Sequence, residues 1–253
     1  MEVHHHPHVE KKNFAAYFLE FLMIFLAVTM GFFAENIREH FVDKEKEKEY
    51  IKSFVEDLSN DEIQLPHLIG FIRWQIRAAD SLPLLLKNVD TKIPANSIYY
   101  FLRGMERQQG INIFITDRTI AQVKNSGEMR LIRNKQISDS LIDYYKQIEF
   151  VAYLQEALLN MKRGLVENLR PILDSYDYDK ISDSLDDLIH PQEILHLRST
   201  EPDAINKCLL SLSDIKGLSR GIITMIIGIK NKAENLKQLI NDKYELEKPE
   251  TKN

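Results

Sequence analysis

The chain has 253 residues and is 44% hydrophobic, a length and composition that allow one large or two small globular domains. It contains only 9 glycines and 8 prolines, which favours helices over a turn-rich β fold. Its formal net charge of −5 gives no electrostatic reason to expect a nucleic-acid partner.

Residues 1–13 form a polar tail that contains the stretch HHHPH. The imidazoles of His4, His5, His6 and His8 are potential ligands of zinc, copper or nickel. Histidines on a short polar terminus are more simply interpreted as solvated side chains. We therefore expect neither a bound metal nor a cofactor in this chain.

Residues 14–36 have the composition of a transmembrane helix. Phe14 to Ala34 is 21 residues long and carries a single charge, Glu20. At ~1.5 Å rise per residue it spans roughly 31 Å, the thickness of a hydrocarbon core. A cleaved signal peptide would have a shorter apolar region that ends at a small-residue site, whereas here Glu35 and Asn36 lead directly into helix-compatible residues. We predict an uncleaved signal anchor that crosses the lipid bilayer once.

Basic residues lie on both sides of this span: Lys11, Lys12, Arg38, Lys44, Lys46 and Lys48. Counting these bases alone would leave the C-terminal domain in the cytoplasm. The bases that follow the span alternate with acids, however, and the first residue past it is Glu35. We expect a bacterial inner-membrane protein with its short tail inside and its C-terminal domain outside the cytoplasm.

One face of the predicted transmembrane helix could have a role beyond anchoring the chain. Its members, on a heptad-like stripe, are Glu20, Ile24, Ala27, Gly31 and Ala34. Ala27 and Gly31 are small residues four apart, which lets two helices approach closely, either in a homo-oligomer or with another membrane protein. Glu20 could then face that interface or bind a proton. The simpler interpretation is that the membrane-spanning segment begins after Glu20, so that the Glu20 side chain reaches the lipid headgroups.

Residues 37–60 are predicted to continue as a solvated helical stalk. Its segment Lys44 to Glu49 reads KEKEKE, so residues three apart have opposite charges while residues four apart have like charges. The net electrostatic support for the helix is therefore small. Apolar residues resume at Ile51 and Phe54.

Residues 61–246 are predicted to form an irregular multi-helix bundle, because glycine, proline and polar breaks divide them into helical stretches. We expect helices over 63–87, from Asn96 or Ser97 to Arg107, from Thr116 to near Gly127, from Asn134 to Leu169 and over 181–189, and a final pair that opens at Thr200 with Gly217 as its hinge. INIFI, residues 111–115, is the longest alternating stretch, and residues 247–253 are expected to be a frayed tail. The fold class is therefore all-α.

The longest amphipathic pattern begins after Asn134. Its apolar positions are Ile137, Leu141, Tyr144, Ile148, Val151, Leu158, Met161, Leu165 and Leu169, with one step of seven residues across Gln155. This spacing predicts the longest helix outside the membrane. Cys208, the single cysteine, has apolar neighbours and is expected to be a core residue.

No sequence-local catalytic motif is present: GxxxxGK[ST], GxGxxG, HExxH and CxxC are all missing. His190, Glu193 and His196 supply one E-x-x-H, but a di-iron bundle needs two such motifs and further carboxylates. Asp177, Asp179 and Asp183 suggest calcium, yet the loop lacks the required glycine and glutamate. We therefore expect that the protein is not an enzyme.

Three segments resemble a family of uncharacterised bacterial single-pass membrane proteins, which is filed as a domain of unknown function. They are YFLEFLMIFLAVTMGFFAENIREH, KEYIKSFVEDLSND and ITDRTIAQVKNSGEMRLIRNKQISDSLIDYY. The resemblance brings no known activity or catalytic residue. In SGEMRLIRN, we expect Gly127 to permit a turn, Met129, Leu131 and Ile132 to enter a core, and Asn134 to cap the long helix. Arg130 and Arg133 could bind a carboxylate or another anion, but we expect them to form structural salt bridges.

Together these features indicate a membrane-anchored, non-enzymatic helical protein that binds a partner or acts as a scaffold. The alternative is a sensor-like input domain that signals through the stalk helix to a separate output partner, because 13 residues before the span are too few to fold into an output domain. An enzyme whose site is assembled from distant residues is a third, less favoured reading.

Overall fold

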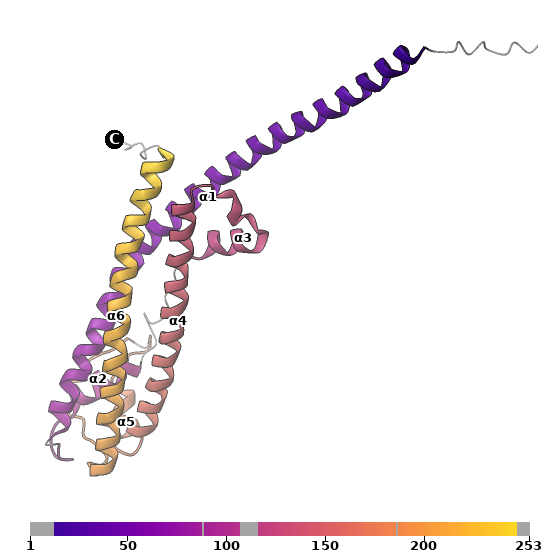
Figure 1. Ribbon diagram of the computed structural model, residues 1–253. Coiled ribbons are helices and arrows are strands. Elements are labelled where there is room, and N and C mark those ends of the chain that lie inside the picture. Colours follow the sequence, from indigo (N-terminus) through magenta and orange to yellow (C-terminus); the bar gives the residue numbers. More distant parts are fainter. Residues whose placement is uncertain (1–12, 88, 107–115, 186, 247–253) are drawn as a thin grey trace, which may run out of the picture. The chain divides into compact units, whose positions relative to one another are not determined.

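The computed structural model describes residues 13–87, 89–106, 116–185 and 187–246 (Figure 1). Their regular elements, in chain order, are α1 Phe14–Leu86, α2 Asn96–Glu106, α3 Arg118–Ser126, the 3₁₀ turn η1 Glu128–Leu131, α4 Lys135–Leu169, α5 Ser175–Asp179 and α6 Pro202–Tyr244. Within these residues, strand-like pairing is limited to an isolated antiparallel bridge between Ser182 and Leu188. The predicted all-α fold class is confirmed. The histidine-rich tail, the INIFI stretch and the C-terminal residues 247–253 lie outside the described residues.

The chain forms two compact units, Met1–Glu49 and Tyr50–Asn253, which are described separately below as the N-terminal and C-terminal units. Helix α1 supplies residues to both of them. The C-terminal unit begins at Tyr50, and Ile51, Phe54 and Leu58 are fully buried in its core. These residues thus belong to the bundle, although the sequence pattern placed them in a stalk that ends at residue 60.

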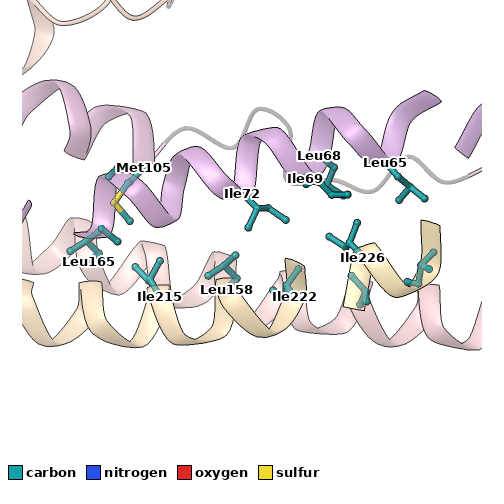
Figure 2. Packing of buried hydrophobic residues seen from close by; sticks show 14 of the residues in the cluster. Leu65, Leu68, Ile69, Ile72, Met105, Leu158, Leu165, Ile215, Ile222 and Ile226 are labelled. Carbon is teal, nitrogen blue, oxygen red and sulfur yellow. The ribbon is translucent and has the colours of Figure 1, made fainter. Parts of the chain in front are cut away.

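Three long helices build the core of the C-terminal unit: residues 50–86 of α1, α4 and α6. Their buried positions advance by alternating steps of three and four residues, the spacing of a coiled coil. On α1 these positions are Ile51, Phe54, Leu58, Asp61, Leu65, Leu68, Ile72, Gln75, Ala79, Leu82 and Leu86. Figure 2 shows how they meet, with Ile72 of α1 directed towards Leu158 of α4 and Ile222 of α6.

Helix α6 is one uninterrupted helix of 43 residues, longer than the 35 residues of α4. The predictions of a hinge at Gly217 and of α4 as the longest helix outside the membrane were therefore wrong. The buried positions continue past the glycine, through Ile215, Ser219 and Ile222. Glycine by itself destabilises a helix, but packing along the whole buried face of α6 keeps the chain helical at Gly217.

The prediction of a helix over residues 181–189 was also wrong, because the described residues of this segment are not helical. Instead, a short helix, α5, precedes this segment, and Asp174 caps it by accepting hydrogen bonds from Tyr176 N and Asp177 N. Beyond α5, the carboxylate of Asp183 accepts hydrogen bonds from the backbone N–H groups of Leu185 and Asp187. An aspartate that bonds its own following backbone stabilises a turn and competes with helix formation.

Local signals around α3 and α4 were predicted correctly. Gly127 ends α3 with φ of 69°, a left-handed conformation that glycine adopts without strain. The side chain of Asn134 caps α4 by accepting a hydrogen bond from Ile137 N at 3.2 Å. Asn96 is different, because its side-chain amide binds the backbone of Pro191, Glu193 and Leu195 instead of capping α2.

The expected core residues are also in place. Leu131 and Ile132 are buried, and Met129 packs partly buried against the same core. Cys208 is fully buried in the core cluster, and this burial raises the pKa of its thiol to about 12. A thiol with this pKa is almost entirely protonated near neutral pH and is a poor nucleophile.

Candidate functional site

The N-terminal unit carries a long apolar surface that no described residue covers. Its part of α1 is long and apolar enough to cross a membrane, and it is the only such helix among the described residues. Large apolar residues along it are open to the surroundings; for example, Phe14 is 87% exposed and Phe32 is 70% exposed. An uncovered apolar surface of this length is typical of a segment that lies in lipid.

The predicted stripe lies on this surface. Glu20, Ile24, Ala27, Gly31 and Ala34 are all exposed residues of the same helix. Apart from the helix's own neighbouring backbone, no atom lies within 4 Å of the point where a Cβ on Gly31 would stand, so the backbone is open to close approach at that residue. Helix packing through this stripe stays a prediction.

In the C-terminal unit, two buried carboxylates of α1 hold the start of α3. Asp61 Oδ1 accepts a hydrogen bond from Thr116 N at 2.9 Å, and Asp57 Oδ2 accepts one from Thr119 N at 3.1 Å. Asp61 Oδ2 also accepts a hydrogen bond from the Tyr144 hydroxyl of α4, at 2.7 Å. We call these five residues the α3 clamp. Free N–H groups at a helix N-terminus favour negative charge. The clamp therefore gives the buried carboxylates hydrogen-bond donors and gives the N–H groups at the start of α3 acceptors.

The two carboxylates of the clamp are fully buried, which is unusual for acidic side chains. Asp57 and Asp61 are both 0% exposed, and burial raises the pKa of Asp61 to about 6 despite its hydrogen bonds. Burial and the neighbouring Asp61 carboxylate also raise the pKa of Tyr144, which keeps this hydroxyl a donor. The arrangement is a structural junction, since both carboxylates accept hydrogen bonds from groups of the protein itself.

Residues of α1 contact η1 and α4 beside this clamp. The hydroxyl of Tyr50 donates a hydrogen bond to the carboxylate of Glu128, 78 residues later in the chain. The ring of Phe54 packs against Tyr145 with 6.2 Å between centroids. These contacts join α1 to the α3–α4 region. Arg130 and Arg133 lie exposed nearby, and a salt-bridge role for them stays a prediction.

Lys162 is the most unusual charged residue of the core. It occupies a core position of α4, is 2% exposed, and its Nζ has no hydrogen-bond partner among the described residues. Lys162 Nζ lies over the ring of Phe71 on α1, 5.8 Å from the ring centroid, where the ring face favours a cation. Burial lowers the pKa of Lys162 to about 7, because an ammonium is poorly solvated in such surroundings.

A hollow of about 170 Å³ opens at Lys162. It is lined by Glu106 at the end of α2 and by Leu159, Lys162, Arg163, Val166 and Glu167 of α4. Glu106 Oε2 is also buried without a hydrogen bond in the described part of the chain, although Arg103 Nη1 lies 3.5 Å away. One hollow is therefore lined by a basic and an acidic residue that each retain unused hydrogen-bonding capacity. We call it the Lys162 hollow.

A second hollow of about 260 Å³ adjoins the first, since Glu106 and Val166 line both. Its other walls are Leu169, Arg170, Leu173, Asp174, Ser175, Tyr178 and Arg198. The guanidinium of Arg103 lies over the ring of Tyr178, 4.8 Å from its centroid. The two hollows together mark the region bordered by α2, α4 and α5 as the candidate ligand site of the C-terminal unit.

The residues that suggested metals have other roles. The backbone N–H of His196 donates to Asp177 Oδ2, Lys180 bridges Asp177 and Glu193, and the ring of His190 stacks on Tyr100 at 4.0 Å between centroids. No group of three or more potential metal ligands occurs among the residues that the structure describes. Asp177 and Asp179 lie in α5, and Asp183 lies in the segment that follows, where its carboxylate accepts hydrogen bonds from backbone N–H groups.

The sequence pattern overlooked the Lys162 hollow for a specific reason. Steps of three or four residues after Leu158 reach either Met161 or Lys162, and hydrophobicity favoured Met161. The structure exposes 40% of Met161 and buries Lys162. The usable signal was the alternation of steps, because Lys162 lies seven residues after Gln155, another polar residue at a core position.

Comparisons of this chain with protein-family models, with curated proteins and with solved structures found no match.

Proposed function

We propose that the chain is a single-pass protein of the bacterial inner membrane whose C-terminal unit lies outside the cytoplasm, binds a protein partner and catalyses no reaction. The observation that carries this proposal is the uncovered apolar surface of the N-terminal unit, which would be unstable in water over such a length. Helix α1 also contains eleven positions of the bundle core, so anchor and bundle share one helix.

An exposed apolar face on α4 supports partner binding. Phe150, Tyr153 and Met161 are 51%, 66% and 40% exposed, and their spacing places them on one side of the helix. Aromatic residues and methionine are enriched where proteins meet, and each of them buries a large apolar area there. We assign this face to a partner helix or to a second copy of the chain.

The test of partner binding is copurification of the full-length chain from its native membranes after crosslinking. A stoichiometric partner should be lost in the double variant Phe150→Asp/Tyr153→Asp and retained in Glu156→Gln, a control at an exposed position of the same helix. Recovery of an uncrosslinked monomer, or equal recovery of the partner in both variants, would contradict the proposed face.

Topology needs a separate experiment. A phosphatase fused to the C-terminus should be active, and a fluorescent protein exported there through the general pathway should be dark, if the C-terminal unit lies outside the cytoplasm. The opposite pair of results would place the unit in the cytoplasm. This outcome would correct the orientation and leave the partner face unaffected.

The second candidate function is signalling, which the continuity of α1 from Phe14 to Leu86 favours. A helix that contains both the apolar surface and core positions of the bundle could transmit a change of packing to a separate output partner. Replacing Lys44 and Lys48 with glycine should weaken the helix between the two regions. Under the signalling hypothesis this variant binds its partner normally but no longer changes the partner's activity; unchanged activity of the partner argues for a scaffold.

A further inference from the structure

We propose that the Lys162 hollow binds a small molecule that carries a carboxylate together with an N–H or O–H donor, such as a small amino acid or hydroxy acid. This inference does not depend on the proposed membrane placement or partner, because the hollow lies entirely within the C-terminal unit.

The ammonium of Lys162 is the first argument. A charge that is buried without a hydrogen bond is strongly destabilising, so proteins pair such groups or replace them with apolar residues. Lys162 is 2% exposed, lines the hollow, and has no hydrogen-bond partner in the described residues. A carboxylate bound in the hollow would supply the missing anion, and the Phe71 ring on the α1 side would favour the cation further.

Glu106 is the second, independent argument. Glu106 lines the same hollow from α2, and its Oε2 atom is buried and accepts no hydrogen bond among the described residues. Arg103 lies 3.5 Å away, which compensates part of its charge but leaves the acceptor unused. A ligand that only offered a carboxylate would leave this oxygen unpaired, whereas an ammonium or hydroxyl group on the ligand would bind it.

The size and remaining charges of the hollow limit the ligand further. A hollow of about 170 Å³ compares with the ~150 Å³ cavity that holds one benzene molecule, so it admits roughly six non-hydrogen atoms. The other charged groups that line it are Arg163 and Glu167 on α4, one of each sign. A zwitterion or a hydroxy acid of alanine or lactate size fits this balanced lining.

Binding should be coupled to a proton. Burial lowers the pKa of Lys162 to about 7, and a carboxylate beside the ammonium would raise it again. The ligand therefore binds the protonated amine, takes up a proton near neutral pH, and binds more weakly as the pH rises above about 7.

The experiment is isothermal titration calorimetry of the full-length chain in detergent micelles with four probes of similar size: L-alanine, L-lactate, propionate and isopropylamine. Alanine or lactate should bind, with propionate and isopropylamine about tenfold weaker or undetectable, as expected when one charged hydrogen bond is lost. Repeating the titration in two buffers of different ionisation enthalpy should reveal proton uptake.

Variants assign the binding to the hollow. Lys162→Met should weaken the better probe by about tenfold or more, and Glu106→Gln should weaken alanine more than propionate. Lys146→Met, at an exposed position of the same helix, should bind like the unmodified chain. Far-ultraviolet circular dichroism checks that each variant is folded. Absence of binding by all four probes, or binding that is unchanged in folded Lys162→Met, overturns the proposal.

Discussion

Replacing Lys162 with methionine should stabilise the C-terminal unit, and the gain should depend on pH. Burial shifts the pKa of Lys162 from 10.5 to about 7. At about 1.4 kcal/mol per unit, keeping the amine charged in the folded state costs about 5 kcal/mol as an upper limit. Measured replacements of buried charges by apolar residues gain about 1–4 kcal/mol, so we expect a stabilisation in that range at neutral pH.

The direction of the pH dependence follows from the lowered pKa. Between about pH 7 and 10.5 the unfolded chain holds a proton on Lys162 that the folded chain has lost, so the stability of the unmodified chain rises with pH across this window. The methionine variant has no such group. Its advantage should be constant below about pH 7 and should shrink towards zero as the pH approaches 10.5.

The assay is urea unfolding of full-length protein in detergent, followed by the fluorescence of Trp74. This is the only tryptophan, and it lies in the C-terminal unit against Phe101, with 6.5 Å between ring centroids. Lys146→Met, at an exposed site, should change stability by less than about 0.5 kcal/mol. A stabilisation by Lys162→Met that is the same from about pH 6 to pH 10, or a loss of stability, would refute the reasoning that the amine is buried at a cost.

Three further predictions concern packing in the same unit, measured by the same unfolding assay. The pKa of Asp61 is raised to about 6 in the folded chain, so the free energy of unfolding of the unmodified chain should fall as the pH rises from about 4 to 6. Relative to Asp61→Asn the fall should reach up to about 3 kcal/mol, and a pH-independent difference between the two would contradict this. Gly104→Ala should destabilise by about 1–3 kcal/mol, because its Cβ would lie 2.1 Å from the Trp74 ring; an unshifted fluorescence spectrum with unchanged stability would disprove the contact. Gly217→Ala, where nothing lies within 4 Å, should stabilise α6 by about 0.5–1 kcal/mol, whereas a functional hinge would show the opposite sign.

Local features of the structure were predictable because neighbouring residues decide them. Gly127 adopts the left-handed conformation that glycine favours, and Asn134 caps the helix that it precedes. The apolar stretch from Phe14 to Ala34 is recognisable from composition alone, since membrane solubility depends on the residues themselves. The step pattern along α4 could have indicated the buried Lys162, but no local signal could have paired it with Glu106, because the two residues come from different helices.

The sequence by itself determined the helical class, the apolar segment and the ends of several helices, because hydrophobic content, capping and backbone freedom act over a few residues. Only the tertiary structure decided whether α6 would bend at Gly217, and which of Met161 and Lys162 would enter the core. It also decided that Asp61 would bind the start of α3. These outcomes depend on contacts between residues far apart in the chain, whose packing and hydrogen-bonding energies override the local preferences of single residues.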